Sequence, residues 1–103
     1  IEDHHIIPRQ FSNHSLIQNC NFDTSCSNNI ICMPALVCKY FLQTDKLIYH
    51  HSHHKYNEFV KFELDNIYET YKYYNDDIMK YQLWLFLKDC ENRLITNDKT
   101  LPW

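Results

Sequence analysis

The chain has 103 residues, the length of one ordinary domain, and we expect residues 1–103 to form a single domain. Apolar residues make up 45% of the sequence and aromatic residues 16%, which supports a packed core and excludes a disordered chain. The net charge of −3 excludes a broadly basic domain that coats nucleic acid by charge alone, and no apolar run approaches the ~20 residues of a membrane span.

The first part of the chain predicts a short strand followed by irregular structure. Residues 3–7 are typical of a strand that ends at Pro8. Residues 9–20 predict a weak helix or an irregular loop, and residues 21–28 are polar and turn-rich. Because the sequence contains no glycine, turns that need a positive φ angle must use Asn or Asp.

A second strand is expected next. Residues 30–33 form a short apolar run that ends at Pro34, which is typical of a buried strand. Residues 35–43 predict either a short helix or an extended excursion.

Two helices are expected in the second half of the chain. From about residue 52 the apolar residues recur at helical spacing, and Ser52 is the expected N-cap. Asn75 is expected to cap a second helix at about residues 76–95, and the tail from Thr96 is expected to be held by Leu101 and Trp103. The first apolar stripe comprises Tyr56, Val60, Leu64, Ile67, Tyr68 and Tyr71. The order of strands followed by helices predicts an α+β fold.

The five cysteines indicate the redox state in which the protein acts. Their number is odd and none of their spacings is Cys-x-x-Cys, so we expect free thiols and a reducing compartment. Cys32 and Cys38 lie in apolar stretches, where we expect them to fill the core. A Cys20–Cys26 disulfide is the alternative if the protein is secreted.

Histidine is the residue type that points to chemistry. Six of the seven histidines fall in two groups, His4 and His5 in the first and positions 50, 51, 53 and 54 in the second. Histidine is the commonest metal ligand and a natural base near neutral pH. Successive side chains of a strand face opposite sides, so His4 and His5 are expected to have different roles unless the backbone bends.

The second group offers two possible ligand pairs. His50 and His54 have i, i+4 spacing, which places both on one face of a helix, and His50 with His53 is the i, i+3 alternative. Either pair can join His4 in a three-histidine metal site with positions open to water and a substrate oxygen. We give His50 and His54 slightly more weight and keep His53 as a candidate.

Three blocks of this sequence, in order, resemble the HNH/endonuclease VII superfamily of ββα-metal (His-Me finger) nucleases. The blocks are residues 3–8, residues 29–34 and residues 50–60. The most similar branch is the AHH nucleases, which are common as toxin domains of bacterial polymorphic toxins. Asp3 replaces the Ala of that family's pattern and Ile30 replaces its usual Gly. The last block has four histidines where the family shows one or two, so its ligands remain ambiguous.

The resemblance implies a small ββα-metal, treble-clef-like core at about residues 3–73, with an extra C-terminal helix. It also implies endonucleolytic hydrolysis of phosphodiester bonds with one divalent metal ion, Mg²⁺, Mn²⁺, Ni²⁺ or Zn²⁺. In that scheme His5 is the general base, and the side-chain oxygen of Asn29 orients the His5 ring. His4 and the later histidines hold the metal, which stabilises the leaving 3′ oxygen.

The charged residues near the histidines point less clearly to a functional role than the histidines do. Arg9 is the only basic residue close to the first group and is a candidate for phosphate binding, although an exposed surface position is an equal alternative. Asp3 is more simply a solvated strand residue than a partner of a histidine. Acidic residues crowd the second half of the chain, and we expect them to lie away from the active cleft; they are Glu58, Glu63, Asp65, Glu69, Asp76 and Asp77.

The resemblance also gives expectations about context. The resemblance favours DNA over RNA as the substrate, and a toxin domain would have a cognate immunity protein as its partner. Since the chain does not begin with Met and has no visible signal peptide, we expect a domain of a larger protein that acts in a target cell's reducing cytoplasm after secretion. The competing hypotheses are a catalytically inactive zinc-binding interaction module and a histidine-rich metal-storage protein.

Overall fold

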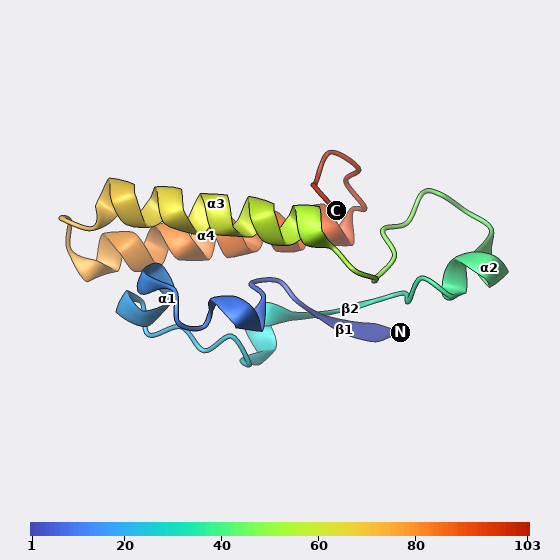
Figure 1. Cartoon of the computed structure of the whole chain (residues 1–103), viewed down its shortest axis with the longest axis horizontal. Coiled ribbons are helices and arrows are strands. Elements are labelled where there is room, and N and C mark those ends of the chain that lie inside the picture. Colours follow the sequence, from blue (N-terminus) through green and yellow to red (C-terminus); the bar gives the residue numbers. More distant parts are fainter.

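The computed structural model describes residues 1–103 and has the α+β character expected from the sequence. A two-stranded sheet is followed by a short helix and a pair of long helices that lie side by side (Figure 1). In chain order the elements are β1 (Glu2–His5), a 3-10 turn (Arg9–Phe11), α1 (Ser15–Asn19), a second 3-10 turn (Ser27–Asn29), β2 (Ile30–Met33), α2 (Cys38–Leu42), α3 (His54–Tyr71) and α4 (Asp76–Ile95). Two paired strands, connected through α1 and followed by helices, are compatible with a ββα-metal core.

The two strands form an antiparallel pair that brings the first histidine group beside the second block of the sequence. In this register Glu2 lies opposite Met33 and His5 lies opposite Ile30. The first strand ends at His5 rather than at Ile7, because Ile6 and Ile7 turn inward and both are fully buried. The backbone N–H of Ile6 still donates to the carbonyl of Asn29 at 2.8 Å, so the pairing continues one residue beyond the strand.

The two long helices confirm the helical spacing of apolar residues in the second half of the sequence. The stripe on α3 buries Tyr56, Val60, Leu64 and Ile67 against α4 and α1. The expectation that Asn75 caps the second helix is also confirmed, because its Oδ1 accepts from the N–H of Ile78 at 3.0 Å. The expected cap at Ser52 is wrong, because α3 begins at His54 and its N-cap is His53.

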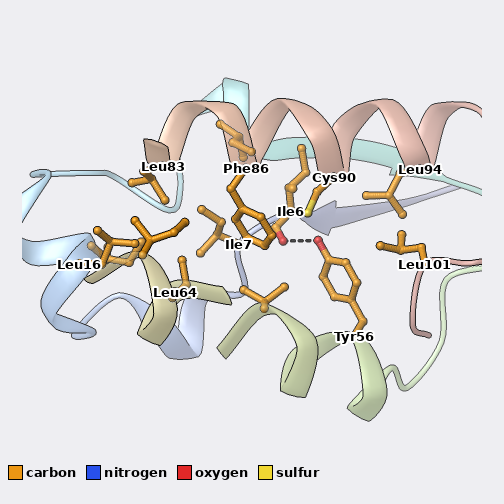
Figure 2. Close-up of a cluster of buried hydrophobic side chains, with 14 of the residues drawn as sticks. Ile6, Ile7, Leu16, Tyr56, Leu64, Leu83, Phe86, Cys90, Leu94 and Leu101 are labelled. Carbon is orange, nitrogen blue, oxygen red and sulfur yellow. Dashed lines mark hydrogen bonds between the residues drawn. The ribbon is translucent and has the colours of Figure 1, made fainter. Parts of the chain in front are cut away.

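Eighteen buried residues form one core cluster. Most come from the two long helices, α1 and the segment that follows β1, and the others include Met33 of β2, Ile48 before α3 and Leu101 of the tail. Figure 2 shows Ile6 and Ile7 inserted between α3 and α4, where the Tyr56 hydroxyl donates to the carbonyl of Ile6. Burial raises the pKa of Tyr56 well above its ordinary value, so the hydroxyl stays protonated and remains a donor. This bond fixes the end of β1 to the first turn of α3.

Three observations refine the expectations for single residues. The residues with positive φ are Asn21, Gln43 and Asn97, so two of the three positions use Asn in this glycine-free chain. All five cysteines are free, but Cys32 is exposed on the two-stranded sheet and Cys38 is only partly buried at the start of α2. Neither belongs to the core cluster, so the expectation that both fill the core is wrong. Residues 38–42 form the short helix α2.

No helix is both long enough and apolar enough to cross a bilayer.

Candidate metal centre

Three histidines from two separate segments, β1 and the stretch that leads into α3, meet at one point. His4 lies on β1, His50 precedes α3, and His53 is the N-cap of α3. One ring nitrogen of each lies within 4.8 Å of the others. The ring centroid of His4 is 5.3 Å from that of His50 and 4.9 Å from that of His53. Small ring rotations bring such a group to the ~2.0–2.1 Å metal–nitrogen distances of imidazole sites.

Backbone pairing explains why His50 reaches this point. The N–H of His50 donates to the carbonyl of Pro34 at 2.8 Å, and the N–H of Leu36 donates to the carbonyl of His50 at 3.1 Å. These bonds form a parallel bridge between Ala35 and His50, directly after β2. Because β2 pairs with β1, the bridge places His50 next to His4.

Two of the three rings are oriented by oxygen acceptors. The Nδ1 of His50 lies 3.3 Å from Oε2 of Glu2, and the Nδ1 of His53 lies 3.0 Å from Oδ1 of Asn57. If each Nδ1 carries the proton and donates to that oxygen, the Nε2 of each ring keeps a free lone pair. Histidine ligands of metals usually donate their other N–H in this way, which fixes the ring and makes it more basic.

His4 is the residue that fits a metal most specifically. Its side chain is 1% exposed, and its Nε2 is buried without any hydrogen-bond partner. An unpaired polar atom in the interior is costly, and a metal ion would satisfy it. Burial, reinforced by the charges of His53, His50 and His5, lowers the pKa of His4 to about 3, so the ring stays neutral and able to bind metal at neutral pH. Burial also lowers the pKa of His53.

The three histidines line a surface pocket of about 170 Å³, together with four other residues. His5 lines this pocket but is not part of the three-histidine group, and its side chain is half-buried. Arg9, on the 3-10 turn after β1, is exposed and lines the same pocket. The lining residues are Asp3, His4, His5, Pro8, Arg9, His50 and His53. Adjacent strand residues therefore reach one pocket, His4 at the three-histidine group and His5 outside it.

The expected helical pair of His50 and His54 does not form. The helix begins at His54, so His50 lies outside it and the two residues cannot share a helical face. His54 is exposed and borders a different hollow, which Gln10 and Lys61 also line. The structure instead joins His4 to His50 and His53.

Asn29 is placed differently from its expected role. Its side chain is fully buried, but its Oδ1 accepts from the N–H of Ile7 at 2.8 Å rather than bonding to the His5 ring. Its Nδ2 donates to the carbonyls of Ile7 at 2.9 Å and Thr24 at 2.8 Å. Asn29 therefore fixes the backbone that follows the two histidines, and its link to His5 is through the chain.

Three residues that contact the histidines were not predicted to belong to the site. Glu2 and Asn57 bond to His50 and His53, and Trp103 packs its ring against His4 and His53. Asn57 follows His53 by four residues, a helical spacing that could have been noticed. Nothing in the local sequence links Glu2 to His50 or Trp103 to His4, because about fifty or more residues separate each pair.

The acidic residues of the second half of the chain lie away from the pocket, as expected. None of the six lines it, and Glu63 instead borders a hollow between α3 and α4. The carboxylates close to the site are those of Glu2 and Asp3 on β1. Asp3 accepts from the Cys32 thiol at 3.5 Å and makes no bond to a histidine.

A comparison with protein families agrees with this geometry. Residues 1–92 match the model of AHH, described as a nuclease family of the HNH/ENDO VII superfamily with conserved AHH. The matched residues include His4 and His5, the adjacent pair compared with this signature on the basis of sequence. No curated protein and no solved structure gives a significant match.

Proposed function

The chain belongs to the AHH family of nucleases in the HNH/ENDO VII superfamily, and we propose that it is an endonuclease that hydrolyses DNA with one divalent metal ion. The buried, unpartnered Nε2 of His4 is the observation that carries the metal dependence. His4, His50 and His53 would hold the ion, since their ligand atoms lie together and two of the rings have oriented partners. An ion bound there supplies Lewis-acid polarisation of the phosphate and charge stabilisation for the leaving 3′ oxygen.

Imidazole ligands suit Zn²⁺, Ni²⁺ and Mn²⁺, and Mg²⁺ is a further candidate when substrate oxygens complete its shell. A structural zinc site uses four protein ligands, whereas the group here contains three. The number of protein donors therefore favours a site open to water and substrate over the closed site of an inactive zinc-binding module.

His5 is the general base in this proposal. It lines the pocket beside His4, but it lies outside the three-histidine group and so keeps a ring nitrogen for a proton. A neutral imidazole accepts that proton from the attacking water, and the water oxygen forms the new bond to phosphorus as the bond to the 3′ oxygen breaks. The 3′ oxygen leaves as a hydroxyl after it gains a proton from solvent.

Arg9 is the proposed phosphate contact. Its guanidinium is exposed at the same pocket as the histidines and makes no ion pair within the chain. Guanidinium groups bind phosphate with two parallel hydrogen bonds. Together with a bound cation, Arg9 would make this pocket locally positive on a chain whose net charge is −3.

We also propose the biological setting implied by the family resemblance. The chain would be the toxin or effector domain of a larger secreted protein, with a cognate immunity protein in the producing cell. Five free cysteines, with Cys32 exposed, suit action in the reducing cytoplasm of a target cell.

The test is cleavage of supercoiled plasmid and of a defined RNA by the purified chain, with Mg²⁺, Mn²⁺, Ni²⁺ or Zn²⁺ and with EDTA. The proposal predicts metal-dependent nicking of the plasmid, abolished by EDTA and slower on RNA. Cleavage that persists in EDTA would overturn metal dependence, and preference for RNA would overturn the substrate. A protein inert on both nucleic acids would be an interaction module rather than an enzyme.

A further inference from the structure

The tail of residues 96–103 folds back over the beginning of α3 (Figure 1). The chain reverses at Asn97, which has a φ of 54°, and the N–H of Asp98 donates to the carbonyl of Arg93 at 2.8 Å. Leu101 is 4% exposed and joins the core near Leu94 and Tyr56 (Figure 2). The tail is therefore held at Asn97, where it turns, and at Leu101, which packs into the core.

Two further bonds tie the tail to the segment that leads into the histidine group. The side-chain Oδ1 of Asn97 accepts from the N–H of Ile48 at 2.8 Å, and Nζ of Lys99 donates to the carbonyl of Leu47 at 2.7 Å. His50 and His53 follow directly along the chain. The tail thus fixes the approach to two of the three proposed ligands.

Trp103 brings the tail to the site itself. Its ring centroid lies 5.1 Å from that of His4 and 5.0 Å from that of His53, and it lies 5.2 Å from the Tyr56 ring. Its Nε1–H donates to the carbonyl of Tyr49 at 2.9 Å, which sets the orientation of the indole. The match to the family model ends at residue 92, so these contacts come from a segment outside the matched part of the chain.

We propose that Trp103 is a positioning residue of the metal site, which holds the His4 and His53 rings in a binding arrangement before the ion arrives. The inference rests on the metal site of the proposed function. An indole is large and rigid, so its packing restricts ring rotation and excludes water from one side of the site. Hydrogen-bond partners of metal-binding histidines typically account for roughly 10–100-fold in metal affinity, and we expect the lower end of that range for a packing contact such as that of Trp103.

The test measures Ni²⁺ and Zn²⁺ affinity of the full chain by competition with a chromophoric chelator. Trp103→Leu is expected to weaken binding by about tenfold, with Trp103→Phe between it and the wild type because it keeps a ring but lacks the N–H donor. Trp84→Leu is the matched control, since Trp84 is exposed on α4 and its ring contacts Tyr81 rather than a histidine. Equal affinities for wild type and Trp103→Leu would overturn the inference and leave the metal site intact.

A spectroscopic measurement tests the same contact without removing it. In a Trp84→Phe variant, Trp103 is the only tryptophan. Its emission is expected to be quenched by one equivalent of Ni²⁺ and to be insensitive to Ni²⁺ when His4→Ala is added. Ni²⁺ that binds without quenching would contradict the placement of Trp103. A wild-type chain that binds neither ion would overturn the proposed metal site as well.

Discussion

Asn29 holds Ile7 through a reciprocal pair of hydrogen bonds across the fold. The Ile7 N–H donates to Asn29 Oδ1 at 2.8 Å, and Asn29 Nδ2 donates to the Ile7 carbonyl at 2.9 Å. Both residues are fully buried, so no water can replace these bonds. The pair fixes the direction of the chain as it leaves His4 and His5 and enters the core between the long helices.

Replacing Asn29 with alanine is expected to destabilise the protein strongly. The substitution leaves the N–H of Ile7 and the carbonyls of Ile7 and Thr24 without their partner in a buried position. Since one such buried group costs ~1–3 kcal/mol, we expect the free energy of unfolding in urea to fall by about 3 kcal/mol. Asn28→Ala is the matched control, because Asn28 is exposed. Similar urea midpoints for the two variants would refute this role.

The structure predicts which of the late histidines bind metal. His53→Ala removes a member of the three-histidine group. Loss of a residue that only hydrogen-bonds to a metal ligand weakens binding by ~10–100-fold, so we expect loss of the ligand His53 itself to weaken Zn²⁺ binding by more than that. His54→Ala should leave affinity unchanged, because His54 lies outside the group. Isothermal titration of both variants would decide. A larger loss of Zn²⁺ affinity for His54→Ala than for His53→Ala would instead support metal binding by His50 and His54.

The buried His4 predicts the pH dependence of stability in the metal-free protein. Its pKa is about 3 in the folded state and about 6.5 when unfolded, so between these values only the unfolded chain is protonated there. Proton binding to the unfolded state lowers the free energy of unfolding as pH falls below ~6.5, by up to ~1.4 kcal/mol per pH unit. The His4 contribution is fully present above pH 6.5 and is lost progressively towards pH 3.

Urea unfolding in EDTA from pH 7.5 to 4.5 checks this dependence, with His4→Leu as the comparison. The variant lacks the titrating group, so its stability should fall less steeply between pH 6.5 and 4.5 than that of the wild type. Parallel curves for the two proteins would show that His4 is not kept neutral by the fold.

The cysteines should differ sharply in reactivity. Cys90 is fully buried, and burial raises its pKa to about 12, so it should resist iodoacetamide until the protein unfolds. Cys32 is exposed, but its hydrogen bond to Asp3 and the charge of that carboxylate raise its pKa. Asp3→Ala should therefore speed alkylation of Cys32 severalfold, as followed by peptide mass spectrometry. Modification of native Cys90 as fast as Cys32 would contradict the packing of α4.

The elements of the fold were largely predictable because they depend on local sequence. The apolar period predicted both long helices, and the run before Pro34 predicted β2 at residues 30–33. Side-chain direction was harder to predict. The apolar neighbours of Cys32 suggested burial, yet a two-stranded sheet has one outer face, and Cys32 lies on it.

The candidate site was predictable in its residue types but not in its geometry. Two histidine groups and their order indicated the site, but the choice of His54 assumed that the helix already included His50. The bridge between Ala35 and His50, which sets the true arrangement, is a long-range backbone contact with no local signal. The same holds for Trp103, whose contacts with the histidines depend on how the tail turns after α4.

The central claim is that two adjacent histidines divide the work, with His4 binding metal and His5 accepting the proton. The most direct measurement is metal content and plasmid nicking on the same preparations of wild type, His5→Ala and His4→Ala. We predict that His5→Ala retains one metal ion per chain and loses nicking, whereas His4→Ala loses both. A His5→Ala protein that has lost its metal, or that still nicks plasmid at the wild-type rate, would contradict the account.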